Sequence, residues 1–333
     1  MSKKFFQALQ VNEVSEKSFQ SEIITRSVEE LPDGDVLIRV LYSSINFKDA
    51  LSASGNKGVT RSYPHTPGID AAGVVVSSKI KEFNEGEEVI VTGYDLGMNT
   101  AGGFGQYIRV PANWLVRRPD GISLRDTMIL GTAGVTSALC IEKLVNAGIE
   151  RNSGDILVTG ATGGVGVISV ALLAKLGFRV VASTGKTSES AYLKALGANS
   201  ILNRNELAES SSRPLSKERW IGAIDVVGGD TLANVTKSIK YGGSVAACGL
   251  VQSPSLNVTV LPFILRGVNL LGVDSVELPL ARKRHIWAKL ANEWRIEDLD
   301  TLCTEITFLE LKDSLELVLA GKAKGRLLLN LES

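Results

Sequence analysis

Cysteine and histidine are scarce in this 333-residue chain, which contains three cysteines and two histidines. The cysteines are Cys140, Cys248 and Cys303, and they form no CxxC pair and no cluster with His65 or His285. Catalytic and structural zinc sites both need clustered ligands of this kind, so the sequence predicts no zinc site. An odd, widely spaced set of cysteines fits reduced thiols in a cytosolic protein better than a disulfide framework.

The chain also lacks an excess of charge of either sign. Lysine plus arginine and aspartate plus glutamate number 36 each, so the formal net charge is zero. This balance removes the usual electrostatic reason to expect nucleic acid or an anionic membrane as a partner. We see no apolar signal-peptide segment at the N-terminus and no stretch near the roughly 20 apolar residues of a spanning helix. We therefore expect a soluble cytoplasmic protein.

Hydrolase motifs are absent as well. No G-x-S-x-G sequence marks a nucleophilic serine. His65 lies within Tyr-Pro-His-Thr-Pro, and we interpret it as a loop residue rather than a general acid.

The elements that are present predict an α/β protein with two domains. Residues 1–125 contain short strands separated by Gly, Pro and Asn, which is typical of a small β-rich barrel. From residue 126 apolar strands alternate with helices, which indicates a doubly wound parallel sheet of the Rossmann type. The chain ends in a strand–helix–strand pattern that we expect to pack on the first domain, so we assign 1–125 and 295–333 to one domain and 126–294 to the other. Predicted strands are 35–42, 71–76, 88–92, 155–159, 179–183, 223–227 and 243–248, and predicted helices are 167–176, 188–196 and 231–239.

A glycine-rich turn carries the strongest functional signal. Gly160, Gly163, Gly164 and Gly166 follow an apolar strand and open a helical pattern, which is the context that a dinucleotide fingerprint requires. Glycines let backbone N–H groups approach a pyrophosphate at the positive end of the helix dipole. The sequence therefore predicts a dinucleotide cofactor.

The end of the next strand favours NADPH over NADH. NAD-selective sites place Asp or Glu there to bind the ribose 2′-hydroxyl. This chain has Ser183, Thr184, Gly185 and Lys186 instead, and no carboxylate until Glu189. Hydroxyls and an ammonium favour a 2′-phosphate, which a carboxylate would repel. Lys186 could also be an ordinary solvated lysine.

Six further motifs resemble a known family. Residues 43–51, 67–73 and 131–136 look like the zinc-free quinone oxidoreductase branch of the medium-chain dehydrogenases/reductases. Residues 246–250, 262–268 and 272–276 resemble, more narrowly, the YhdH/YhfP group of acrylyl-CoA reductases. The similarity covers essentially the whole chain. It implies a GroES-like catalytic domain built from both chain ends, a Rossmann domain between them, and reduction of acryloyl-CoA to propionyl-CoA by NADPH.

The resemblance also implies roles for individual residues. One departure is Phe47, which stands where the family usually has tyrosine, so a hydroxyl is missing. By position, the residues that would bind cofactor phosphates are Thr162, Gly163, Gly164, Val165, Thr184, Gly185 and Lys186; Gly166 and Ser183, from the glycine turn and the strand end, complete the expected cofactor site. Arg204 would reach the 2′-phosphate or the adenosine, and Phe47, Thr136, Leu250, Ile264 and Ser275 would line the nicotinamide.

Catalysis requires hydride transfer to the β-carbon and stabilisation of charge on the thioester oxygen. Asn46 is the first candidate for that polar contact because its amide can donate a hydrogen bond without carrying charge. It could equally cap the helix expected to begin near Lys48. We expect Asp49 to be structural and Cys248 to be inert.

Two other functions and two kinds of partner follow from the same sequence. A quinone reductase on this scaffold would use the same NADPH, and a non-catalytic NADPH-sensing or nucleic-acid-binding relative is a third possibility. The apolar segment 268–274 is expected to be an edge strand that pairs with a second copy to form a homodimer. Lys57, Arg61 and the cations at 282–284 are candidates for contacts with the phosphates of coenzyme A, or are ordinary solvated charges.

Overall fold

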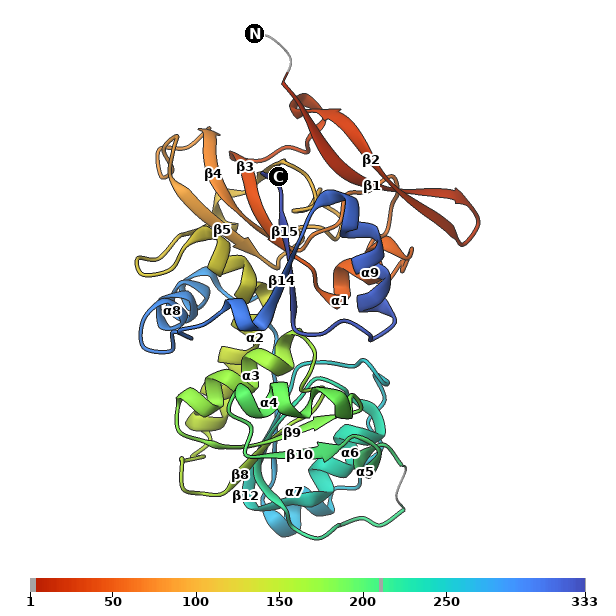
Figure 1. The fold of residues 1–333 in the computed structure, drawn as a ribbon, viewed down its shortest axis with the longest axis vertical. Coiled ribbons are helices and arrows are strands. Elements are labelled where there is room, and N and C mark those ends of the chain that lie inside the picture. Colours follow the sequence, from red (N-terminus) through yellow and green to blue (C-terminus); the bar gives the residue numbers. More distant parts are fainter. Residues whose placement is uncertain (1–3, 210–211, 333) are drawn as a thin grey trace. The chain divides into compact units, whose positions relative to one another are not determined.

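The computed structural model describes residues 4–209 and 212–332. The chain separates into two compact units. Unit 1 comprises Met1–Thr132, Val276–Glu293 and Glu297–Ser333, and unit 2 comprises Ala133–Ser275 and Trp294–Ile296. In Figure 1 unit 1 carries the red-to-yellow and blue ends of the colour scale, and unit 2 carries the green and cyan between them.

Unit 1 is built on a seven-stranded sheet, as expected for a β-rich domain. Its order is β14-β15-β3-β4-β5-β7, with β6 also pairing with β3. A separate antiparallel ribbon joins β1 (Phe5–Ser15) to β2 (Ser18–Ser27). The sheet strands are β3 (Val36–Ser44), β4 (Asp70–Ser78), β5 (Glu88–Thr92), β6 (Tyr107–Val110), β7 (Val116–Arg117), β14 (Cys303–Ile306) and β15 (Arg326–Asn330).

Pairing of β15 with β3 brings the two ends of the chain together. The register places Leu328 opposite Ser44 in an antiparallel pair. Alternate residues of β3 such as Val36, Ile38 and Val40 are buried in the apolar core of the unit, which is why this period-2 pattern forms a strand. As a result Arg326, at the start of β15, lies in the same sheet as β4 and as Ser44 at the end of β3.

Short helices complete unit 1. α1 (Phe47–Ala53) packs against α9 (Leu311–Leu319), and α8 (Leu280–Ala291) lies against β7. Single 3-10 turns occur at η1 (Val28–Glu30), η2 (Ala112–Trp114), η4 (Asp300–Leu302) and η5 (Phe308–Glu310).

The boundaries between the units differ from those expected from the sequence. The first lies after Thr132 rather than at 126, and the segment Val276–Glu293 belongs to unit 1. The reason lies in α8, where Lys283 is buried and its ammonium donates to the carbonyl of Thr92 at the end of β5 in unit 1.

The long helix α2 (Leu124–Asn146) contradicts one expectation. It has 23 residues and is apolar enough to cross a membrane by length and composition, although the sequence analysis found no such stretch. However, 83% of its apolar window is buried inside the protein, as in the core helix of a soluble protein. Its regular geometry breaks at Gly131, where φ is 51° and ψ is −153°.

Unit 2 confirms the doubly wound sheet. Six strands pair in parallel in the order β10-β9-β8-β11-β12-β13, which is the strand order 3-2-1-4-5-6 of dinucleotide-binding folds. The order reverses between β8 and β11, so a ligand is expected at the carboxyl ends of these two strands. The strands are β8 (Asp155–Val158), β9 (Arg179–Thr184), β10 (Ser200–Asn203), β11 (Trp220–Asp225), β12 (Ile239–Ala247) and β13 (Asn269–Gly272).

Helices follow the strands of unit 2, as the alternating pattern predicted (Figure 1). Leu157, Ala223, Val235 and Val245 meet in its apolar core, which holds the helices on the sheet. The helices are α3 (Gly164–Lys175), α4 (Ser190–Ala195), α5 (Asn205–Ala208), α6 (Gly229–Ser238) and α7 (Leu261–Arg266), with a 3-10 turn at η3 (Thr187–Glu189).

Candidate active site

The glycine-rich turn of unit 2 joins β8 to α3 at the point where the strand order reverses. The N–H of Gly163 donates to the carbonyl of Gly160 at 2.9 Å, and Gly160 has a φ of 57°. A Cβ on Gly166 would stand 2.3 Å from the Gly160 carbonyl oxygen, so a side chain there would collide with backbone. The N-cap residue of α3 is Gly163, which has no side chain to occupy the first N–H groups of the helix. These N–H groups can therefore bind an anion.

Hydroxyl groups connect this turn to the end of β9. The N–H of Ala161 donates to the carbonyl of Ser183 at 3.0 Å. Thr162 and Thr184 bring their hydroxyl oxygens within 3.3 Å of each other, and Thr184 Oγ1 accepts the N–H of Lys186 at 3.0 Å. The residues predicted to bind phosphate thus come together in one place.

Two cations stand at the same end of β9. The backbone N–H of Arg204 donates to the carbonyl of Thr184, and a Cβ on Gly185 would lie 2.4 Å from Arg204 Nε. The guanidinium group therefore covers Gly185. Burial lowers the pKa of Lys186, the charge of Glu189 opposes this shift, and the neighbouring Arg204 adds to it. Two cations beside threonine hydroxyls are a suitable environment for a phosphate group, so the residues present fit a dinucleotide that carries a 2′-phosphate.

The residues predicted to line the nicotinamide are only partly brought together. Thr136 and Ser275 are buried, and their hydroxyl oxygens lie 2.8 Å apart. Leu250, which follows β12, and Ile264, in α7, are 59% and 68% exposed. Large exposed apolar side chains can contact either a ligand or another protein chain.

A buried carboxylate, which the sequence analysis did not identify, lies at the reversal of strand order. Thr159 donates its hydroxyl to Asp225 Oδ1 at 2.7 Å, and the N–H of Gly228 donates to Oδ2 at 2.7 Å. Burial raises the pKa of Asp225 to about 6 against these hydrogen bonds. Asp225 thus fixes the loop after β11.

In unit 1, Asn46 is the N-cap residue of α1, which was the structural alternative for it. Its backbone N–H donates to Asp49 Oδ2 at 2.8 Å, and Asp49 Oδ1 accepts the N–H of Ile69 at 2.7 Å. Burial raises the pKa of Asp49 to about 7, and the nearby charge of Asp70 adds to the shift. Phe47 is the first residue of α1 and is half-buried.

Asp70 is the centre of a buried polar cluster that the sequence analysis did not identify. Its side chain is fully buried. Oδ2 accepts Ser44 Oγ at 2.7 Å, Asn46 Nδ2 at 2.8 Å and the N–H of Thr132 at 2.9 Å, and Oδ1 accepts Thr132 Oγ1 at 2.6 Å. A single aspartate at the start of an otherwise apolar strand was the signal that could have revealed it.

Arg326 lies on the other side of Asn46. Its Nε donates to the carbonyl of Ile129 at 2.8 Å, and its Nη1 lies 3.3 Å from the carbonyl of Ile45 and 3.5 Å from Asn46 Oδ1. Its buried Nη2 has no hydrogen-bond partner among the described residues. Burial lowers the pKa of Arg326, while Asp70 and Asp49 oppose the shift. An arginine at the start of an apolar strand was the sequence signal in this case.

The break at Gly131 makes this cluster possible. A Cβ on Gly131 would stand 2.4 Å from Ser44 Oγ and 2.5 Å from Asp70 Oδ2. The non-helical turn directs the N–H of Thr132 to Asp70 and leaves the carbonyl of Ile129 to Arg326. Only glycine fits this position, for reasons of both conformation and space.

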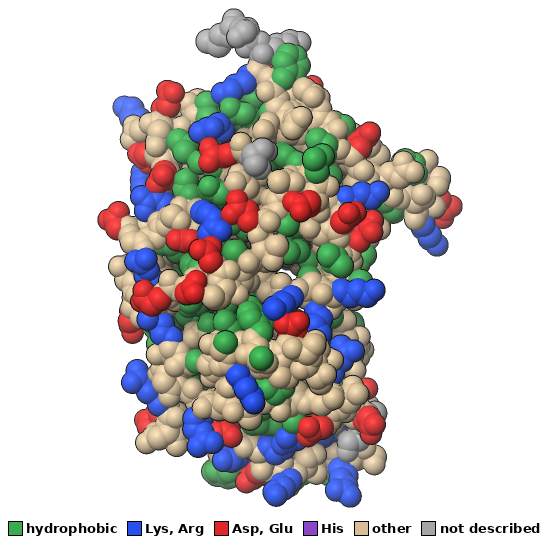
Figure 2. Space-filling model, viewed as in Figure 1, with side chains coloured by type: hydrophobic (Ala, Val, Ile, Leu, Met, Phe, Trp, Pro, Cys, Tyr) green, Lys and Arg blue, Asp and Glu red, His purple; other side chains and the backbone are tan. Residues whose placement is uncertain are grey.

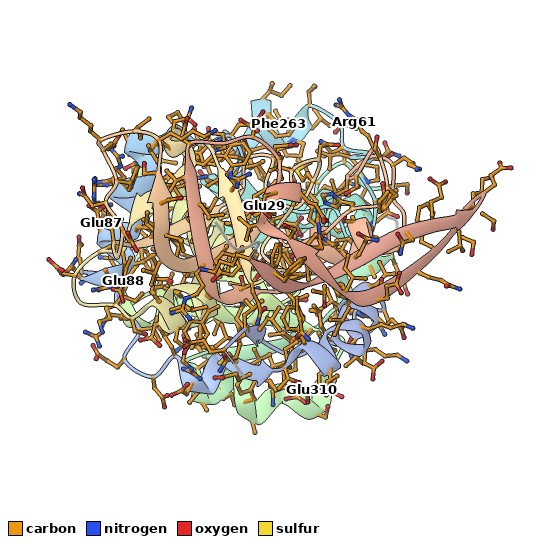
Figure 3. The ribbon with its side chains drawn as sticks, turned by 90° about the horizontal axis from the view of Figure 1, so that it is seen from above. Glu29, Arg61, Glu87, Glu88, Phe263 and Glu310 are labelled. Atoms are coloured by element: carbon orange, nitrogen blue, oxygen red, sulfur yellow. The ribbon has the colours of Figure 1, made fainter. Side chains whose placement is uncertain are left out.

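The proposed phosphate-binding cations of unit 1 have different environments. Lys57 forms an ion pair with Glu13 at 2.6 Å, and its ammonium lies over the ring of Tyr63. Its charge is therefore already neutralised within the protein. Arg61 is exposed, and Figure 3 shows its side chain pointing outward. Within 282–284, Lys283 is fully buried, with its Nζ 3.5 Å from the centre of the Tyr94 ring. The prediction is wrong for Lys283, because a buried, bound ammonium cannot line a substrate entrance.

His65 has the environment of a structural residue. It is buried, and its Nε2 lies 2.9 Å from the carbonyl oxygen of Gly97. Burial lowers its pKa. Among residues 4–209 and 212–332, no three His, Cys, Asp or Glu side chains gather where they could hold a metal ion.

Models of two known protein families match this chain, one in each half. The model of the alcohol dehydrogenase GroES-like domain matches residues 32–120, and the model named zinc-binding dehydrogenase matches 164–292. AcuI of Ruegeria pomeroyi, named as an acrylyl-CoA reductase, is 40% identical over 98% of this chain and 100% of its own. YhfP of Bacillus subtilis, named as a quinone oxidoreductase, is 43% identical over 98% of this chain and 99% of its own.

Two solved structures are similar over the full length. The yhdH oxidoreductase from Salmonella enterica, in complex with NADP, has a TM-score of 0.94 at 45% identity and covers 97% of this chain and 99% of its own. The Bacillus subtilis yhfP structure, with NAD bound, also has a TM-score of 0.94, at 43% identity over 98% of this chain and 100% of its own.

Proposed function

The chain belongs to the YhdH/YhfP group of the medium-chain dehydrogenases/reductases, and we propose that it reduces the double bond of acryloyl-CoA to give propionyl-CoA, with NADPH as donor. The 40% identity with a protein named acrylyl-CoA reductase, over almost the whole of both chains, carries this proposal. Like its relatives, the protein is an oxidoreductase. Its two units are the GroES-like and the Rossmann domains of that family.

The cofactor site of unit 2 supports NADPH. The glycine turn and the N-terminus of α3 bind the pyrophosphate, and Thr162 and Thr184 add hydroxyl contacts. Lys186 and Arg204 bind the 2′-phosphate by charge-assisted hydrogen bonds. The solved relatives hold NADP in one case and NAD in another, so these two cations are the residues expected to decide the preference in this chain.

The proposed reaction needs a hydride for the β-carbon and a proton for the α-carbon. When bound, NADPH supplies a hydride for the β-carbon of the unsaturated thioester. Thr136 and Ser275, through their mutual hydrogen bond, hold a polar surface for the nicotinamide end, and Leu250 and Ile264 supply apolar contacts. Phe47 has no hydroxyl and can give no proton, so the proton for the α-carbon comes from another group or from solvent.

A quinone reductase is the alternative that a named relative favours, because YhfP carries that name. Both activities would use the same unit 2 site and differ in what binds beside the nicotinamide. The third possibility, a non-catalytic or nucleic-acid-binding protein, has little support on the surface. Figure 2 shows basic and acidic side chains interspersed over the visible face rather than a broad basic area.

A substrate panel tests the proposed function. Oxidation of NADPH is followed with acryloyl-CoA, free acrylate, a longer 2-enoyl-CoA and a small uncharged quinone, each with and without excess chelator. We expect acryloyl-CoA to give the highest kcat/KM and the chelator to have no effect. A quinone reduced far faster than the thioester would establish the alternative, and no turnover of any compound would establish the third possibility.

The edge of the unit 2 sheet supports a homodimer. β13 ends the strand order, and Leu270 on it is partly exposed. Val260 and Leu265, on or beside α7, are both more than half exposed. An open apolar edge is a liability unless it is covered, and pairing with a second copy around a two-fold axis would cover it. A monomeric mass at micromolar concentration would contradict this assembly.

The protein is expected to act in the cytoplasm. Its relatives of this group are named as reductases of small molecules, and the apolar face of α2 is used inside the protein. Arg61 is the cation proposed to contact the phosphates of coenzyme A.

A further inference from the structure

Two of the three cysteines lie in unit 2, and the fold brings them together from distant parts of the chain. In α2, Thr136, Cys140 and Lys143 share one face, because residues three and four positions apart lie on the same side of a helix. At one end of this face the hydroxyl oxygen of Thr136 lies 2.8 Å from Ser275 Oγ. At the other end Lys143 Nζ donates to the carbonyl of Gly272 at 2.5 Å. The face that holds Cys140 therefore lies along residues 272–275.

Cys248 reaches the same place from the sheet. It directly follows Ala247, the last residue of β12, which pairs in parallel with Gly272 of β13. The N–H of Val273 donates to the carbonyl of Ala247 at 3.0 Å. Cys248 thus emerges beside the segment that the Cys140 face covers. In agreement with this placement, the neighbouring thiol of Cys248 is the largest cause that raises the pKa of the Cys140 thiol.

The two thiols differ in their access to solvent. Cys140 is fully buried, and this burial adds to the rise of its pKa, so its sulfur stays protonated. Cys248 is only half-buried, and its thiol donates a hydrogen bond to the carbonyl of Asp225 at 3.4 Å. A small oxidant in solvent therefore meets the Cys248 sulfur first, with a second thiol behind it. A resolving thiol beside an accessible one is typical of cysteines that form reversible disulfides.

We propose that Cys140 and Cys248 are a modification site, at which a hydroperoxide converts the pair of thiols reversibly into a disulfide. From the sequence Cys248 was expected to be inert, because no other cysteine stands near it along the chain. The site goes beyond the proposed function, since it needs neither a cofactor nor a thioester. In a reducing cytoplasm a disulfide of this kind is transient and redox-sensing.

The oxidation takes two steps. The Cys248 sulfur attacks an oxygen of hydrogen peroxide, the O–O bond breaks, and the released hydroxide takes the thiol proton and leaves as water, so that a sulfenic acid remains. The Cys140 sulfur then attacks the Cys248 sulfur, the S–O bond breaks, and a second water leaves with the Cys140 proton. The two thiols lose two electrons in all, and the peroxide gains them. A dithiol reductant reverses the reaction by thiol–disulfide exchange.

The disulfide would act on the loop that follows β12. The N–H of Cys248 donates to the carbonyl of Asp225 at 2.9 Å. The N–H of Gln252 donates to the carbonyl of Val227 at 2.8 Å, so this loop lies against the loop that follows β11. Both loops stand at the carboxyl ends of parallel strands, where dinucleotides bind, and this one carries Leu250. Oxidation removes the S–H donor of Cys248 and pulls the loop toward α2. It should therefore weaken the binding of NADPH, a consequence that rests on the proposed function.

Peptide mapping of the whole protein after oxidation tests the proposal. Reduced protein is treated with a small excess of hydrogen peroxide, remaining thiols are alkylated in denaturant, and the digest is analysed by mass spectrometry without a reducing agent. We expect a linked pair of peptides that contain Cys140 and Cys248, two hydrogens lighter than the free pair, which dithiothreitol separates. Cys303, half-buried on β14 of unit 1, is the internal control and should stay unlinked. Oxidation of Cys248 without any linked pair would overturn the proposal.

Single substitutions assign the two roles. In Cys140→Ala the Cys248 sulfur lacks its resolving partner, so sulfenic acid should accumulate there and react with dimedone. In Cys248→Ala the buried Cys140 should remain a thiol under the same treatment. Cys303→Ala is the matched control and should form the same disulfide as wild type. If Cys140→Ala accumulates no more sulfenic acid than wild type, Cys140 is not the resolving thiol. The wild-type map decides whether the disulfide forms, even if a substitution in the core impairs folding.

The effect on the cofactor is measured separately. Titration gives the Kd for NADPH of reduced and peroxide-treated protein, for wild type and for Cys248→Ala. We expect the Kd of wild type to rise about 3- to 10-fold on oxidation, the effect of losing one hydrogen bond, and to return with dithiothreitol. The Kd of Cys248→Ala should not respond to peroxide. Equal Kd values for both forms of wild type would refute the link to the cofactor. Because the peptide map uses neither NADPH nor thioester, a failure of the proposed function would leave its result intact.

Discussion

The polar groups of the two units are used in opposite ways. In unit 2 the glycine turn leaves the first N–H groups of α3 without a side-chain cap, and Lys186 and Arg204 stand beside threonine hydroxyls at the end of β9; these residues lie between 160 and 204. In unit 1 the polar atoms around Asp70 mostly satisfy one another, and they come from residues 44–49, 70, 131–132 and 326. The first arrangement is suited to binding and the second to holding a shape. Substitutions in unit 2 should therefore change affinity, and those around Asp70 should first change stability.

The largest effect is expected at Gly131. Gly131→Ala would place a Cβ against Ser44 Oγ and Asp70 Oδ2 in a conformation that favours glycine, and should destabilise the fold by about 3 kcal/mol or more. The matched control is Gly321→Ala, which also has a positive φ but open space, and should cost about 1–2 kcal/mol. Urea denaturation followed by tryptophan fluorescence measures both. Equal losses would mean that the buried cluster adds no constraint at Gly131.

In unit 2 the largest expected effect of a substitution is on the affinity for NADPH. Lys186→Ala and Arg204→Ala should each weaken NADPH about 10- to 100-fold, the loss of a charge-assisted contact, and should spare NADH. Lys194→Ala, an exposed cation at the end of α4, is the control and should change neither. Calorimetric titration gives the Kd values. A similar loss for both dinucleotides would refute the assignment of the 2′-phosphate site.

The protonation of Asp49 makes the stability of the folded protein depend on pH. Its pKa is raised from its usual value near 4 to about 7, so the folded state holds the proton more tightly than the unfolded state. Its contribution to stability is fully present below pH 4 and is lost as the pH rises through 7. The Asp49→Asn side chain cannot titrate. Relative to wild type, the free energy of unfolding of this variant should therefore be higher at pH 8 than at pH 5, by on the order of 2 kcal/mol.

Urea denaturation at pH 5 and pH 8 measures this difference. Asp225→Asn, in unit 2, is the counterpart and should show the same trend at lower pH, because burial raises that pKa only to about 6. If the free energies of unfolding of wild type and Asp49→Asn differ by the same amount at both pH values, Asp49 is ionised throughout.

The smallest effect is expected at Arg61. Arg61→Glu should raise the KM for acryloyl-CoA about 3- to 10-fold at low salt, less at high salt, and leave the quinone rate unchanged. Lys81→Glu reverses an equally exposed charge elsewhere in unit 1 and should do nothing. Steady-state kinetics at two ionic strengths give the comparison. Equal effects of the two reversals would assign Arg61 to the solvated surface.

The same contrast explains what the sequence could predict. The parallel sheet, its edge strand and the glycine turn depend on local patterns within a few dozen residues, and the structure confirms the fold. The cluster at Asp70 depends on pairing of β15 with β3 and on a break in α2, which no local pattern reveals. The second unit boundary differed because a buried lysine, Lys283, anchors α8 in unit 1, where the sequence showed only a run of basic residues.

The most direct test of the account follows the hydride itself. Wild-type protein is given acryloyl-CoA and NADPH carrying deuterium at C4, in excess chelator, and the thioester product is examined by mass spectrometry and NMR. We expect propionyl-CoA with one deuterium on the β-carbon and an unlabelled hydrogen from solvent on the α-carbon, at a rate the chelator does not change. An unreduced thioester beside rapid reduction of a quinone, or activity that is lost with chelator and restored by zinc, would contradict the account.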